Sequence, residues 1–140
     1  MRIKTETHNK ILHACSAATF ETGGILGGRN NVISEFLFDE GLASGTAGCY
    51  HPDTNILNQC LMEWQHQKID FYGIVHSHFT DIAALSQGDK EYIRMILLAM
   101  PPEIKSLYFP LVLPEQRMIA FKAKRSGKTI NITSDGITIL

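Results

Sequence analysis

The feature that most constrains the fold is a near-continuous apolar run in residues 70–76. The run includes Phe71, Tyr72, Ile74 and Val75, and it ends on a histidine. It lacks the regular alternation of a half-exposed strand, and such a run is typical of a strand that is buried on both faces. We therefore expect the rest of the chain to build an α/β fold around this strand.

Helical and extended patterns alternate along the rest of the chain. Apolar residues recur at helical spacing in three segments, and Pro101-Pro102 ends the third because proline cannot continue a helix. Residues 39–52 form the longest irregular stretch. The expected helices cover residues 5–19, 53–67 and 86–100, and the expected strands cover residues 23–28, 32–38, 70–76, 106–113, 117–123 and 129–140, the last interrupted at 135–136. This order predicts an α/β sandwich with a curved, mixed β-sheet flanked by three helices.

The composition is that of one globular domain spanning residues 1–140. Hydrophobic residues make up 44% of the chain and charged residues 19%, and the formal net charge of -1 gives no reason to expect a nucleic-acid partner. No apolar run is long enough to span a membrane, and residues 1–10 lack the apolar region of a secretory signal. The three cysteines show no C-x-x-C spacing, so we expect a reducing, cytoplasmic compartment.

The residues after the buried strand predict a metal site. His76 and His78 are two apart at the strand end, so both imidazoles point to the same side. Asp89 lies three residues into the helix that Ser86 should cap, where its charge complements the helix dipole. Two histidines, one carboxylate and an open fourth position are typical of a catalytic zinc site.

Each element also has a simpler interpretation. A single histidine at a strand end is more often structural than a ligand, and Ser-x-x-Asp is a common way to begin a helix. The joint pattern outweighs these interpretations. Two other groups carry less weight: Asp81 has the wrong offset from His78 for a different metallohydrolase pattern, and Cys49 with His51 shows only C-x-H spacing in the irregular stretch.

The pattern resembles that of the JAMM (MPN-plus) zinc metalloproteases. The family signature is an upstream glutamate followed by His-Ser/Thr-His, seven residues and Ser-x-x-Asp. This chain has His76-Ser77-His78, seven residues, then Ser86 and Asp89, and its segment 21–28, Glu-Thr-Gly-Gly-Ile-Leu-Gly-Gly, looks like the segment that carries the family's glutamate. The resemblance covers about residues 10–125 and implies a compact, prokaryotic-type member with an MPN fold.

The resemblance also implies roles for these residues. It implies Zn²⁺ bound by His76, His78 and Asp89, with Glu21 as the general base and then acid, and Ser86 as the donor to the oxyanion. It further implies hydrolysis of a peptide or isopeptide bond at the C-terminus of a ubiquitin-like protein or its conjugate.

Several alternatives remain open at this stage. The motif does not separate removal of a modifier from processing of its precursor, and either activity would accompany a ubiquitin-like activation and conjugation system. A different class of function is a non-catalytic MPN scaffold within a larger complex, which has no chemical need for all five site residues. DNA-repair relatives of the fold are disfavoured because the chain lacks an extended basic patch. A homodimer is compatible with the sequence.

Overall fold

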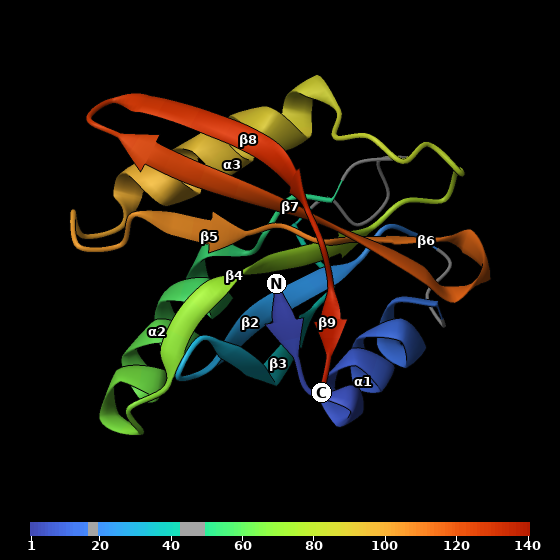
Figure 1. Ribbon diagram of the computed structural model, residues 1–140, viewed down its shortest axis with the longest axis horizontal. Helices are drawn as coiled ribbons and strands as arrows, with labels where there is room; N and C mark the ends of the chain where they lie inside the picture. The colour runs from blue at the N-terminus through green and yellow to red at the C-terminus, as the bar shows by residue number, and fades with distance from the viewer. Residues whose placement is uncertain (17–19, 43–49) are drawn as a thin grey trace.

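The computed structural model describes residues 1–16, 20–42 and 50–140. Within these residues, nine strands form one mixed sheet in the order β5-β7-β6-β4-β2-β3-β1-β9, with β8 paired to β7 (Figure 1). The strands are β1 (Arg2–Ile3), β2 (Gly23–Arg29), β3 (Val32–Asp39), β4 (Asp70–Ser77), β5 (Ser106–Tyr108), β6 (Leu111–Leu113), β7 (Arg117–Ser126), β8 (Thr129–Asp135) and β9 (Thr138–Ile139). The helices are α1 (Thr5–Ser16), α2 (Thr54–His66) and α3 (Gln87–Ala99). The predicted α/β architecture with a mixed sheet and three helices is confirmed.

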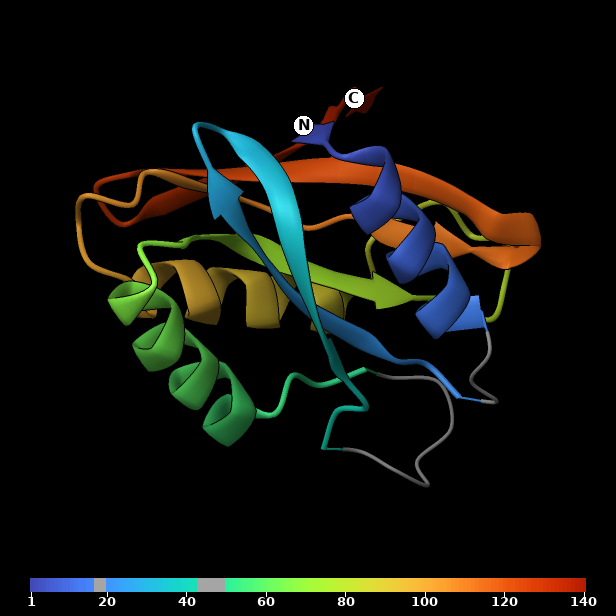
Figure 2. The same ribbon diagram turned by 90° about the horizontal axis from the view of Figure 1, so that it is seen from below.

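Strand β4 lies at the centre of the sheet and is covered on both faces. It pairs antiparallel with β2 and parallel with β5 and β6. Ile74 packs in the core beneath α2 and α3, whereas its neighbour Val75 packs in a second core beneath α1. The same alternation separates Ile25 from Leu26, because successive side chains of a strand point to opposite faces. Figure 2 shows α2 and α3 together on one side of the sheet and α1 on the other.

The structure corrects one of the expected strands and confirms the interruption of another. Residues 106–113 form two strands instead of one, because Pro110 has no N–H to donate to the ladder. The register with β7 is nevertheless unbroken, since Tyr108 opposes Lys122 and Leu111 opposes Ile119. The expected interruption of the last strand separates β8 from β9.

Other departures from expectation lie near the ends of elements. Strand β1 was not predicted, because two residues are too few to show a pattern; it pairs parallel with β3 and β9. The last three residues of the first expected helix, 17–19, lie outside the described residues. In the described part of the chain, no helix has the length and hydropathy that a bilayer-spanning segment requires.

Gly73 shows why β4 can lie so close to its neighbour. Its φ is +147°, and a Cβ added there would lie 1.7 Å from the carbonyl oxygen of Tyr108. Gly73→Ala is therefore expected to destabilise the fold by at least about 3 kcal/mol, combining backbone strain with overpacking. Gly136→Ala is the matched control, because a Cβ there meets no heavy atom within 4 Å. Urea unfolding of both variants measures the difference, and equal midpoints would contradict this account of the β4–β5 contact.

Candidate metal centre

The two histidines lie where β4 emerges from the sheet. His76 is fully buried, and the backbone remains extended beyond the end of β4, because the N–H of His78 donates to the carbonyl of Val112 at 3.0 Å. Both side chains consequently lie on the same side of the chain, as their spacing predicted. Their Nε2 atoms are 3.1 Å apart.

The start of α3 brings a carboxylate to the same point. The N–H of Asp89 donates to Ser86 Oγ at 3.0 Å, and Asp89 Oδ2 accepts from the Ser86 N–H at 2.9 Å, which completes a capping box. This cap holds Asp89 Oδ1 at 3.3 Å from His76 Nε2 and Oδ2 at 3.2 Å from His78 Nε2. The side chain that stabilises the helix start is therefore also the third member of the cluster.

In each histidine ring, Nδ1 contacts a neighbouring residue and Nε2 faces the cluster. His78 Nδ1 lies 3.3 Å from the carbonyl oxygen of Ile82, and His76 Nδ1 lies 2.8 Å from the hydroxyl of Tyr92. Burial lowers the pKa of His76, which favours its neutral, metal-binding form. Hydrogen bonding to Asp89 raises the pKa of His78. Burial by itself would raise the pKa of Asp89, but its hydrogen bonds with both histidines hold it well below its usual range.

These three donors fit a metal ion. One ligand atom from each of His76, His78 and Asp89 lies within 4.8 Å of the other two. Two imidazole nitrogens and a carboxylate oxygen directed at one another need a proton or a cation between them, and this donor set is one that zinc accepts. The cluster could thus hold a divalent ion with a further position free for water or substrate.

Glu21 reaches this region through the pairing of β2 with β4. Gly23 opposes His76, and the ladder continues as Ser77 N–H donates to the Thr22 carbonyl at 2.8 Å and Thr22 N–H donates to Ser77 Oγ at 3.0 Å. The next residue back along the chain, Glu21, therefore comes beside His78. The structure brings all five sequence-predicted residues into one region, with Glu21 next to the three-ligand cluster and not part of it.

The environment of Glu21 favours a proton acceptor. The side chain is half-buried, and this burial raises the pKa of Glu21 above its ordinary value. The negative charge of Asp89 also raises it, whereas the charge of His78 and the backbone N–H groups of Tyr50 and Phe79 act in the opposite direction. A carboxylate with a raised pKa binds a proton more readily at neutral pH.

The two weaker alternatives from the sequence lie outside the cluster. Asp81 is exposed and pairs with the guanidinium of Arg117 at the surface. Cys49 lies outside the described residues, and His51 is exposed.

Sequence reasoning missed the aromatic residues around His76. The ring of Tyr50 stacks on His76 with centroids 5.8 Å apart and planes 10° apart, and Tyr92 meets it edge-on at 5.7 Å. The buried carboxylate of Asp39 accepts hydrogen bonds from the Tyr50 hydroxyl and from the backbone N–H groups of Gly41 and Asp53, each at 2.9 Å. Tyr92 follows Asp89 by one helical turn, a spacing that could have indicated its place. Asp39 and Tyr50 lie within the stretch of residues 39–52 that was expected to be irregular, and they carry no comparable signal.

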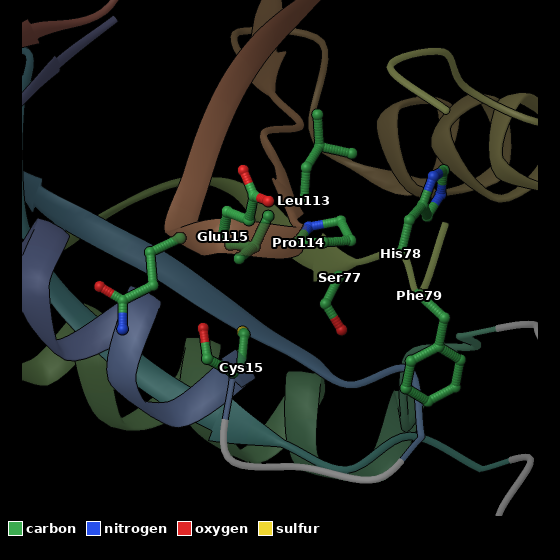
Figure 3. A pocket seen from close by; sticks show the side chains of 10 residues that line it. Cys15, Ser77, His78, Phe79, Leu113, Pro114 and Glu115 are labelled. Carbon is green, nitrogen blue, oxygen red and sulfur yellow. The ribbon is translucent and has the colours of Figure 1, made fainter. Parts of the chain in front are cut away.

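A pocket of about 270 Å³ opens beside His78 (Figure 3). The end of α1, with Cys15, lies across from the β6–β7 turn, with Pro114 and Glu115, and Ser77 lies between them (Figure 3). Within this turn Glu115 and Gln116 both have positive φ, which is uncommon for residues other than glycine. The lining residues are Cys15, Ser16, Ser77, His78, Phe79, Val112, Leu113, Pro114, Glu115 and Gln116. Space for part of a substrate therefore borders a candidate metal ligand.

Solved structures resemble this chain along its whole length. No protein-family model matches the sequence, and no curated protein matches it. A protein of Desulfitobacterium hafniense, solved in solution, has a TM-score of 0.71 at 18% identity, with 99% of this chain and 92% of that one covered. A Jab1/MPN domain protein from Archaeoglobus fulgidus has a TM-score of 0.60 at 18% identity, with 100% and 99% covered. A structure described as JAMM, a metalloprotease-like zinc site in the proteasome and signalosome, has a TM-score of 0.57 at 18% identity, with 100% and 97% covered.

These likenesses establish the fold. The chain has the MPN (JAMM) fold, as the resemblance in its sequence implied, and the matched structures are nearly the same length as this chain. At 18% identity these structures show the fold alone, and the chemistry depends on the residues of the site itself.

Proposed function

We propose that this protein is a zinc-dependent peptidase or isopeptidase that hydrolyses the bond after the C-terminus of a ubiquitin-like protein. The observation that carries the proposal is the convergence of His76, His78 and Asp89 with a half-buried carboxylate, Glu21, beside them. A metal site with three protein ligands, an open position and an adjacent acid is an arrangement that supports hydrolysis. A metal held for structure alone is usually closed by four protein ligands.

In this proposal His76 and His78 hold zinc through Nε2 and Asp89 holds it through a carboxylate oxygen. When bound, zinc supplies a Lewis acid and lowers the pKa of a coordinated water to about 7. Glu21 accepts a proton on its carboxylate and returns it to the departing amine. Its partial burial raises the pKa of the carboxyl group, which favours uptake of that proton.

Ser86 acts as the donor to the substrate carbonyl. Its Oγ already accepts from the Asp89 N–H, which fixes the oxygen and leaves the hydroxyl proton free to donate outward. Ser86 is exposed at the helix start, so a substrate can reach it. A donor held in position before substrate arrives can stabilise developing negative charge without reorganisation.

Ser86→Gly is expected to lower the turnover rate by about 100- to 1000-fold while zinc stays bound. Glycine is tolerated at an N-cap at a cost of only a few tenths of a kcal/mol, so α3 should still begin at the same residue. Single-turnover kinetics and metal analysis of the same preparation separate the two effects. Loss of zinc together with activity would show that Ser86 acts only through the position of Asp89.

The substrate class is supported by the fold and by the pocket beside His78. One solved structure of similar fold is described as a metalloprotease-like zinc site in the proteasome and signalosome. The pocket offers space next to the ligands for residues that flank a scissile bond. We further propose that the protein acts beside a ubiquitin-like activation and conjugation system, either removing the modifier from an amine or trimming its precursor.

A panel of fusions between ubiquitin-like proteins and amines, analysed by mass spectrometry, tests the proposal. We expect cleavage directly after the modifier's C-terminus in zinc-loaded protein, and no cleavage after treatment with a chelator. Zinc-loaded protein that cleaves no fusion in a broad panel would favour the non-catalytic scaffold instead. Protein that binds no zinc would contradict the assignment of His76, His78 and Asp89.

A further inference from the structure

The Nδ1 atoms of His76 and His78 have different kinds of hydrogen-bond partner. His78 Nδ1 faces the carbonyl oxygen of Ile82, which can only accept, so this nitrogen carries the ring proton. His76 Nδ1 faces the hydroxyl of Tyr92 at 2.8 Å, and a hydroxyl can donate or accept. The backbone thus fixes the tautomer of His78, whereas the partner of His76 permits both tautomers.

We propose that Tyr92 is a positioning residue of the metal site and that its hydrogen bond with His76 reverses direction when the metal binds. The inference rests on the proposed function, in which His76 Nε2 is a ligand. Without the metal, His76 Nε2 carries the proton and donates to Asp89 Oδ1, 3.3 Å away, while the Tyr92 hydroxyl donates to Nδ1. With the metal, Nε2 offers its lone pair, so the proton lies on Nδ1 and is donated to the Tyr92 oxygen.

His76 could expose a lone pair to the metal either by a flip of its ring or by a change of tautomer. The packing around His76 favours the change of tautomer, which reverses the hydrogen bond with Tyr92. The His76 ring is fully buried, with Tyr50 stacked on one face and Tyr92 edge-on. Tyr92 is itself buried and packs edge-on against Phe109 with ring centroids 6.2 Å apart. A close-packed cluster of this kind has little space for a ring flip or for a water molecule to replace the hydroxyl. The ring therefore keeps its position whether or not the metal is bound.

Tyr92→Phe tests the positioning role through metal affinity. It removes the acceptor for Nδ1–H in the metal-bound form, and loss of such a partner typically weakens metal binding about 10- to 100-fold. Tyr50→Phe is the matched control, since it also removes a buried tyrosine hydroxyl beside His76, but one that is bonded to Asp39. Competition with a chelator gives zinc affinities for both variants and for the wild type. Equal affinities in the two variants would overturn the proposal, whereas a wild type that binds no zinc would overturn the proposed function instead.

The reversal itself is tested in the wild-type protein, so it does not depend on whether a variant folds. The ¹⁵N chemical shifts of the imidazoles report which nitrogen carries the proton. On addition of zinc, the proton of His76 is expected to move from Nε2 to Nδ1, while His78 keeps its proton on Nδ1 and serves as an internal reference. A His76 tautomer that is the same with and without zinc would refute the reversal. A structural contribution of Tyr92 to packing alone would not move this signal.

Discussion

Glu21→Gln is expected to lower the rate of cleavage by about 100- to 10,000-fold and to leave the bound zinc in place. Glutamine has nearly the same size and can still accept the backbone hydrogen bonds of this position, but it cannot take up a proton. The carboxylate lies beside His78 and outside the ligand cluster, so its loss should not open the metal site. The variant therefore separates binding of the metal from movement of the proton.

The measurement compares turnover of one cleaved fusion with the zinc content of the same samples. Glu103→Gln is the control, because Glu103 is exposed and outside the candidate site. Its activity should equal that of the wild type. A Glu21→Gln variant with full activity would remove Glu21 from the mechanism. A variant that is inactive because it has lost zinc would instead make Glu21 part of the metal site.

The three residues of the candidate metal cluster were predictable because their local geometry is set by the strand and the helix that carry them. His76 and His78 are two residues apart on a strand, so their side chains share one side of it. Asp89 is the third residue of a capped helix, so the cap fixes its place. Neither relation depends on how distant parts of the chain pack. The buried strand was predictable for a similar reason, since its apolar run requires cover on both faces.

The position of Glu21, in contrast, is set by contacts between distant parts of the chain. It depends on the register between β2 and β4, which places Thr22 opposite Ser77 across more than fifty residues of chain. A one-residue shift in that register would turn Glu21 to the other face of the sheet. Only the likeness of segment 21–28 to a known motif indicated the residue in advance.

The aromatic surroundings of His76 could not be predicted for the same physical reason. Tyr50 lies within the stretch expected to be irregular, and its hydroxyl donates to the buried Asp39 while its ring stacks on His76. That contact depends on tertiary packing and leaves no periodic pattern in the sequence. The division of residues 106–113 into β5 and β6 did have a visible cause in Pro110.

Asp89→Asn is expected to weaken zinc binding at least about 100-fold while α3 remains capped. Structural zinc sites with four ligands bind with about 10–16 kcal/mol, or roughly 3 kcal/mol per ligand, and each 1.4 kcal/mol is a factor of ten. Asparagine keeps an oxygen that accepts from the Ser86 N–H, but it loses the charge that both histidines face. The change therefore removes the ligand and spares the capping box.

Asp53→Asn provides the matched control for this change. Asp53 is the N-cap of α2, where its side chain accepts from the N–H groups of Asn55 and Ile56, and asparagine caps helices about as well as aspartate. The same substitution is thus made at two helix starts, of which one faces the histidines. Zinc titration should show weak binding for Asp89→Asn and wild-type binding for Asp53→Asn. Tight zinc binding by Asp89→Asn would mean that the carboxylate serves the helix cap alone, and the third ligand would have to be sought elsewhere.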